Sequence, residues 1–307
     1  MAAPMRWIVR PGDGATVGDI LVRVGADVDA VRDGRVFIGR LRVKASDERV
    51  REGDELSVAA PRSGEPGSVR ILLQADDIVA ADKPAGVPTI ADHGGAAHAL
   101  VAMVARSLSI DVARLHPTSR LDRDVSGVVV FALSRAAAAR LQQARIDGLY
   151  QRRYVAIAEH SPVPERGTWD APIGRGPNPR LRVEGGRDPV PANTRYAVTA
   201  RTQRGAAMLA VAPVTGRTHQ IRVHAAGAGA PLLGDRSYGG PARLTLASGR
   251  VIEPGRIALH AARVVVPGAG GDTLVAESPV PAELESLWSA LGGEAGAWEV
   301  SLACALD

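Results

Sequence analysis

The sequence predicts an α+β protein of two domains, a small one over residues 1–60 and a larger one over residues 70–290. Short apolar segments rich in β-branched residues, typical of strands, alternate with a few helical segments. A chain of 307 residues is long enough to build two cores. Residues 61–69 contain two prolines and two glycines, which indicates a linker. Residues 291–307 show no readable pattern and are assigned as a C-terminal tail.

The composition is that of a folded protein. Hydrophobic residues make up 46% and charged residues 23% of the chain, values that exclude a disordered class. A single cysteine, Cys304, excludes an internal disulfide and a cysteine-based zinc site. The sequence shows neither a signal-peptide apolar region nor an apolar run of membrane-spanning length. We therefore expect a cytoplasmic protein without membrane contacts, and we expect a monomer.

The basic residues are almost all arginines, although the net charge is only +4. Lys44 and Lys83 are the only lysines. The planar fork of arginine suits phosphate, because it donates two parallel hydrogen bonds. A codon bias toward Arg, Ala and Gly explains the same composition equally well. The charge therefore permits a nucleic-acid partner without establishing one.

The N-terminal segments predict a compact unit over residues 16–58. Residues 17–21 open a short helix, residues 34–43 form a hairpin that turns near Gly39, and residues 50–58 form a turn and a final strand. This order resembles the S4-like RNA-binding module, with its G-x-V-x-I/V-x-G hairpin and V-x-x-G-D-x-L-x-V ending. The helical part carries little positive charge, so a generic small α/β unit is the alternative.

The larger domain is organised around Asp122. Strands at residues 71–73 and 78–80, a tight loop at 82–88 and a helix at 96–107 precede it. The charged cluster at residues 120–127 runs directly into the apolar segment 128–133, which reads as a buried strand. A carboxylate held beside a rigid strand is suited to chemistry. The alternative is an ordinary turn whose Asp and Arg residues pair with each other.

The next segments bring a tyrosine toward this carboxylate. A helix runs from the N-cap Ser134 to the stop at Gly148, and a strand follows at residues 153–158. This order places Tyr154 close to Asp122. Residues 161–192 are rich in Pro, Gly and Arg and are predicted to be a surface loop, or alternatively an arginine-bearing arm over a phosphate backbone. Residues 194–198 and 207–211 are predicted to be paired strands.

A short helix is predicted within residues 215–227, capped by Thr215 or Thr218 and ended by Gly227. Its amide groups and basic side chains suit a carboxylate or a phosphate. His219 and His224 are five residues apart without an evident third ligand, so we predict no metal site. A turn at residues 233–240, a strand at 257–267 and a helix at 284–291 follow.

Six motifs spread over roughly residues 70–287 are similar to those of the RluA family of RNA pseudouridine synthases. In chain order they are 82–86 (DKPAG), 119–127 (SRLDRDVSG), 152–156 (RRYVA), 215–224 (TGRTHQIRVH), 234–239 (GDRSYG) and 259–261 (LHA). The fourth matches the family's T-G-R-T-H-Q-I-R-V-H in full. Ser119 and Val125 depart from the pattern, which has a histidine and a threonine there.

The resemblance implies a mixed, mostly antiparallel sheet with flanking helices. It also implies an isomerase that detaches uracil from its ribose, turns it and rejoins it through carbon, with no cofactor or metal. In that reaction Asp122 is the reacting carboxylate, Arg222 keeps it ionised and positioned, and Tyr154 contacts the extruded base. Arg120 would fill the space that the flipped nucleotide leaves. The further substrate-binding residues expected are Arg217, His219 and Gln220.

The expected partner is structured RNA. Ribosomal RNA is favoured over transfer RNA, because an S4-like module is common on synthases for large-subunit ribosomal RNA. One alternative is a catalytically inactive RNA-binding or ribosome-assembly protein, which the departures at Ser119 and Val125 support. Another is an unrelated acid–base hydrolase that uses Asp122 and a histidine, but the sequence places no second catalytic carboxylate or activated serine.

Overall fold

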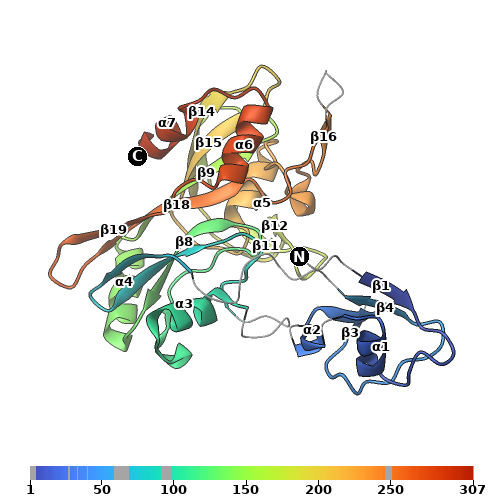
Figure 1. Ribbon diagram of the computed structural model, residues 1–307. Helices are drawn as coiled ribbons and strands as arrows, with labels where there is room; N and C mark the ends of the chain where they lie inside the picture. Colours follow the sequence, from blue (N-terminus) through green and yellow to red (C-terminus); the bar gives the residue numbers. More distant parts are fainter. Residues whose placement is uncertain are drawn as a thin grey trace. The chain divides into compact units, whose positions relative to one another are not determined.

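The structure, a computed structural model, describes residues 5–26, 28–32, 34–39, 41–58, 69–90, 98–245 and 251–306. The chain divides into two compact units (Figure 1). The smaller comprises Met1–Gly67 and Ala91–Ala99, and the larger comprises Ser68–Ile90 and Leu100–Asp307. All but the last residue of the predicted linker at 61–69 lie outside the described residues.

The smaller unit is a four-stranded antiparallel sheet, in the order β1-β4-β2-β3, with two short helices. Thr16 caps the first helix, and Asp19 bonds back to complete a capping box. Gly39, at a φ of 57°, forms the turn of the predicted hairpin. The elements are β1 (Met5–Ile8), α1 (Val17–Arg23), α2 (Asp29–Arg32), β2 (Val36–Ile38), β3 (Leu41–Arg42) and β4 (Glu55–Val58).

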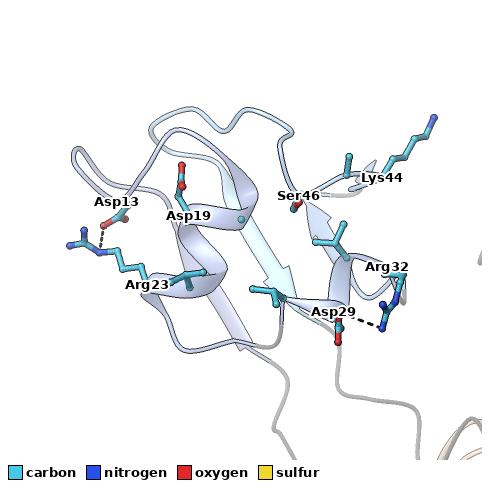
Figure 2. Close-up of a pocket in the computed structure, with 12 residues that line it drawn as sticks. Asp13, Asp19, Arg23, Asp29, Arg32, Lys44 and Ser46 are labelled. Carbon is cyan, nitrogen blue, oxygen red and sulfur yellow. Dashed lines mark ion pairs between the residues drawn. The ribbon is translucent and has the colours of Figure 1, made fainter.

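A surface hollow of about 850 Å³ lies on this unit (Figure 2). Arg23 is paired there with Asp13, and Arg32 with Asp29. Lys44 also lines the hollow and extends away from these two pairs in Figure 2. Two of the basic groups are therefore already neutralised by carboxylates.

The larger unit contains a ten-stranded sheet, a three-stranded sheet and a two-stranded hairpin. Its strands are β5 (Ile71–Ala75), β6 (Ile78–Lys83), β7 (His116–Pro117), β8 (Ser126–Ala132), β9 (Gln151–Ala158), β10 (Arg166–Trp169), β11 (Ile173–Arg175), β12 (Arg182–Glu184), β13 (Arg187–Val190), β14 (Thr194–Arg201), β15 (Ala207–Pro213), β16 (Leu244–Thr245), β17 (Val251–Ile252), β18 (Leu259–Pro267) and β19 (Thr273–Glu277). Its helices are α3 (Leu100–Leu108), η1 (Val112–Arg114), α4 (Arg135–Ile146), α5 (Gln220–Gly227), η2 (Arg236–Tyr238), α6 (Ala282–Ala290) and α7 (Ala297–Ala303).

The large sheet has the order β10-β14-β15-β9-β18-β8-β6-β5, with β19 added on β18 and β7 on β8. β18 and β8 run parallel, and the other described pairings in this sheet are antiparallel. The expectation of a mixed, mostly antiparallel sheet with flanking helices is confirmed. The α+β class is confirmed with it.

Strand β8 shows how the sequence pattern produces two cores. Its side chains are buried along the whole strand, so the apolar run is continuous rather than alternating. Val128 and Val130 pack with Leu141 of α4, whereas Val129 and Phe131 belong to the core on the opposite face. The rigid strand that follows Asp122 is therefore held from both sides.

The two faces of the sheet carry different helices. Helices α4, α6 and α7 pack on one face, through residues such as Leu141, Trp288 and Trp298. Helices α3 and α5 pack on the other, through residues such as Val104 and Ile221. The second face also holds the Asp122 loop and Tyr154, so the predicted site lies on the side of α3 and α5.

Three segments differ from the sequence interpretation. Helix α3 begins at Leu100 rather than at residue 96, and residues 96–97 lie outside the described part of the chain. The segment 161–192 contains strands β10 to β13 instead of only loop. The region assigned as a tail contains α7, whose Trp298 is buried in the core. These short segments, several of them rich in Pro and Gly, carry too little hydrophobic periodicity to reveal such strands or such a helix.

Candidate active site

The loop that carries Asp122 is fixed by its backbone on both sides. The amide of Leu121 donates to Thr89 Oγ1 at 3.0 Å, and the Thr89 hydroxyl donates to the Leu121 carbonyl at 3.0 Å. On the other side, Lys83 Nζ donates to the Arg123 carbonyl at 2.9 Å. Asp122 therefore projects from a loop whose two adjacent residues have little freedom.

Lys83 is the residue that joins two loops beneath the site. Its side chain is fully buried, and its Nζ also donates to the carbonyls of Pro84 at 3.0 Å and Val87 at 2.6 Å. Burial lowers the pKa of Lys83 to about 7, with the charge of Arg256 acting in the same direction. The three carbonyl oxygens are the acceptors that an ammonium group needs. The 82–86 motif thus supports the Asp122 loop.

Arg222 forms an ion pair with the predicted carboxylate. Its Nη1 lies 2.8 Å from Asp122 Oδ2, while its Nε and Nη2 bond both oxygens of Asp235 at 2.7 and 2.8 Å. The side chain of Arg222 is 7% exposed and that of Asp235 1%, whereas Asp122 retains 26%. Burial alone would lower the pKa of Arg222, but Asp235 and Asp122 raise it above its ordinary value. Arg222 is therefore a fixed cation that presents Asp122 to solvent.

Asp235 and Tyr238 complete this arrangement, and both come from the 234–239 motif, for whose residues the sequence alone predicts no role. Asp235 aligns the guanidinium of Arg222 in the bidentate geometry typical of arginine and carboxylate. The Tyr238 ring lies 4.8 Å from the Arg222 guanidinium carbon, within the range of a cation–π contact. The motif itself was the only signal for these two residues.

His219 also faces Asp122. Its Nε2 lies 3.8 Å from Asp122 Oδ1, and its ring meets that of Tyr238 edge to face. Burial lowers the pKa of His219, and the charge of Asp122 opposes that effect. The predicted site residues Asp122, Arg222 and His219 therefore converge.

The start of helix α5 differs from the prediction. Neither predicted threonine caps it: the N-cap is His219, with a left-handed φ of 59° and no side-chain cap. Thr215 instead donates to Gln220 Oε1 at 2.7 Å. The side-chain nitrogen of Gln220, Nε2, donates to the Asn193 carbonyl and to Thr194 Oγ1, both at 2.9 Å. Gln220 is 4% exposed, and these hydrogen bonds hold its side chain at the start of the helix.

Tyr154 lies in the same core cluster as Leu121 and Val125, which come from the loop that carries Asp122. It is 8% exposed and sits on β9 between Val211 and Ala261 of the neighbouring strands. Burial raises the pKa of Tyr154, and the nearby charge of Asp122 adds to this. Its phenol therefore stays neutral at ordinary pH.

The other predicted arginines lie at the surface. Arg217 is exposed, and its Nε donates to the Pro191 carbonyl at 2.8 Å. Arg120 is exposed and makes no hydrogen bond or ion pair with the residues that the structure describes. Of the two departures from the family pattern, Val125 is buried in the core, and Ser119 accepts a 3.5 Å bond from Tyr150.

A buried polar network lies just after the Asp122 loop. His260 Nε2 is 3.2 Å from the Ser278 carbonyl, which can only accept, so His260 carries its proton on Nε2. Its Nδ1 then accepts from Ser126 Oγ at 2.8 Å, and Ser126 Oγ accepts from Arg256 Nη2 at 2.7 Å. Burial lowers the pKa of His260 to about 4. This network joins the parallel strands β8 and β18 where β8 begins.

Among the described residues, no cluster of three or more His, Cys, Asp or Glu side chains could hold a metal ion. Nor does any described helix have the length and apolar character needed to cross a membrane. The site consists of an ion-paired, part-exposed carboxylate, a fixed cation, a histidine and a neutral tyrosine. Such a set suits attack or proton abstraction by the carboxylate.

Comparisons with known proteins identify the family. Residues 77–227 match the model of the family described as RNA pseudouridylate synthase. The chain is 34% identical over 251 residues to an uncharacterised RNA pseudouridine synthase, YhcT, of Bacillus subtilis, covering 78% of this chain and 79% of that one. It is 35% identical over 234 residues to ribosomal large subunit pseudouridine synthase D of Xanthomonas campestris, covering 73% and 69%. Human RNA pseudouridylate synthase domain containing 4 aligns with a TM-score of 0.60 and 26% identity, covering 73% of this chain and 94% of that one.

Proposed function

The chain belongs to the RNA pseudouridylate synthase family, and we propose that Asp122 is the carboxylate that isomerises uridine to pseudouridine in RNA. The observation that carries this proposal is the 2.8 Å ion pair between Asp122 Oδ2 and Arg222 Nη1. The pair orients the carboxylate while 26% of its side-chain surface stays open to a substrate.

The reaction explains the residue types. The bond between uracil N1 and ribose C1′ breaks, a new bond forms between C5 and C1′, the C5 proton is released and N1 takes up a proton. Asp122 acts on the sugar as nucleophile or as base, and an ionised carboxylate serves both roles. Tyr154 borders the base, and its neutral hydroxyl is able to hydrogen-bond. Arg120 enters the duplex in place of the flipped nucleotide, consistent with its exposed side chain.

The RNA we favour is ribosomal RNA of the large subunit rather than transfer RNA. One relative is named for that subunit, and the smaller unit has the element order of an S4-like module. Arg217 would contact the RNA backbone beside the site, because its guanidinium is exposed. We expect the protein to act as a monomer in the cytoplasm. The ion-paired Asp122 argues against the alternative of an inactive RNA-binding protein, because RNA binding alone does not require it.

Release of tritium from RNA labelled at C5 of uridine tests the activity directly. The expected result is time-dependent release from total RNA of a strain that lacks the gene. Absence of release from every RNA fraction would contradict the proposed activity. Mapping pseudouridines in strains with and without the gene then identifies the target, and a lost site in transfer RNA alone would reject the ribosomal assignment.

A further inference from the structure

A chain of hydrogen bonds reaches the site from strand β12. The backbone amide of Arg182 donates to Tyr238 Oη at 3.0 Å, and Tyr238 Oη lies 2.7 Å from His219 Nδ1. The opposite nitrogen of the same ring, Nε2, faces Asp122 Oδ1 at 3.8 Å. In the part of the chain that the structure describes, these are the two hydrogen bonds of the Tyr238 hydroxyl.

The donor and acceptor of each of these hydrogen bonds are considered starting from the Arg182 amide. A backbone amide can only donate, so Tyr238 Oη accepts from Arg182. The tyrosine has one proton of its own, and His219 Nδ1 is the acceptor at hand. With the tyrosine hydroxyl as donor to His219, Nδ1 is unprotonated, and the proton of a neutral His219 lies on Nε2, on the side of Asp122.

We propose that Tyr238 is a positioning residue that locks His219 as the neutral Nε2–H tautomer, aimed at the Oδ1 oxygen of Asp122. This inference rests on the proposed function, in which Asp122 reacts. Oδ2 of Asp122 is occupied by Arg222, so Oδ1 is the oxygen left to act on the substrate. A neutral N–H beside it stabilises negative charge without forming a second full ion pair.

The surroundings of His219 agree with the neutral form. The charged or titratable groups that face it are Asp122, Arg222, Asp235, Arg182 and Tyr238. The two arginines disfavour a protonated ring, as does burial, and the two aspartates oppose them; the net effect lowers the pKa of His219.

The backbone of His219 is also specialised. Its φ of 59° lies in the left-handed region, which is uncommon for a residue other than glycine, although histidine enters it more often than most side chains. Such a conformation costs free energy and persists where the surrounding structure holds it. Here it turns the imidazole toward Tyr238 and Asp122 together.

Tyr238→Phe tests the proposal with a minimal change, because it keeps the ring that packs on Arg222 and His219 and removes only the hydroxyl. The substitution removes the hydrogen bond to His219 and also the one from the Arg182 amide. We expect kcat to fall about tenfold, the effect of the lost bond to His219, with KM for RNA unchanged. The acid limb of the pH–rate profile should move to higher pH, because the neutral ring loses the donor that stabilised it. Unchanged kcat and an unchanged profile would overturn the proposal.

Histidine ¹⁵N spectra give a readout that needs no activity. The His219 signals are identified by their loss in His219→Gln, and we expect an unprotonated Nδ1 and a protonated Nε2 at pH 7.5. A protonated Nδ1 in the wild-type protein would refute the locked tautomer. Absence of tritium release from any RNA would instead refute the proposed function. The spectra would still decide which nitrogen of His219 carries the proton.

Two substitutions at His219 separate its hydrogen bond from its backbone. His219→Asn tolerates the left-handed backbone well but is too short to reach Asp122. His219→Gln extends an N–H to about the position of Nε2. We expect the Gln variant to retain more activity than the Asn variant, although its backbone is more strained. The reverse order would show that His219 serves only the backbone.

Discussion

Asp235→Asn is the substitution that tests the ion-pair arrangement most severely. It keeps the shape of the side chain and removes one charge from a buried set of two carboxylates and one guanidinium. One oxygen of the new amide still accepts from Arg222, while its NH₂ group faces a second N–H of the guanidinium. Arg222 then lacks one hydrogen bond and half of its compensating charge.

The size of the effect follows from burial. Arg222 is 7% and Asp235 1% exposed, so water replaces little of the lost interaction. Breaking a buried ion pair by removing one partner costs about 3–5 kcal/mol. Because Asp122 still pairs with Arg222, we expect the lower end, about 3 kcal/mol of unfolding free energy. For a unit of this size that corresponds to a loss of roughly 6–12 °C in melting temperature.

Thermal unfolding followed by circular dichroism measures this change, with Glu277→Gln as the matched control. Glu277 pairs with Arg263 at 3.3 Å, but the two side chains are 65% and 46% exposed, so its loss should cost no more than about 1 kcal/mol. The reasoning would be refuted if Asp235→Asn lowered the melting temperature no more than the control. Tritium release should also fall, because Arg222 no longer holds Asp122 in one orientation.

Two further predictions concern the strands behind the site. As pH falls from about 6.5 toward 4, the unfolded chain protonates His260 before the folded protein does, so the free energy of unfolding should decrease by about 3 kcal/mol in that window. His260→Gln should remove this component in urea titrations at pH 7 and pH 4.5, and an identical pH dependence in both proteins would contradict the assignment. Gly127→Ala should destabilise the protein severely, because φ there is +116° and a Cβ would collide with the Ala261 backbone of the parallel strand. Gly167→Ala is its control: the nearest atom lies at 3.5 Å, and little change is expected.

Much of the larger fold was predictable from local pattern. The apolar run 128–133, the helix after Ser134 and the pair of strands at 194–198 and 207–211 all appear as expected. Each has an apolar pattern or a helix N-cap that can be read from the local sequence. The strands within 161–192 and helix α7 did not follow from such signals, because their pairing and burial depend on distant partners.

The site was predictable only in part, for a related reason. Asp122 and Arg222 are a hundred residues apart, and only the motifs suggested that they meet. Asp235 and Tyr238 went unassigned because their roles are directed at Arg222 and His219, which are defined only after folding. Gln220 lies in the same motif as His219 and Arg222, but the helix turns its side chain toward Asn193 and Thr194.

The central claim is that the Asp122 carboxylate performs the reaction, and Asp122→Asn tests it most directly. Tritium release from C5-labelled RNA should be abolished, while the circular dichroism spectrum and RNA affinity stay close to those of the wild-type protein. The amide retains the size of the side chain and an oxygen for Arg222 but loses the charge needed to act on the sugar. If the variant released tritium at the wild-type rate, Asp122 would not be the reacting group.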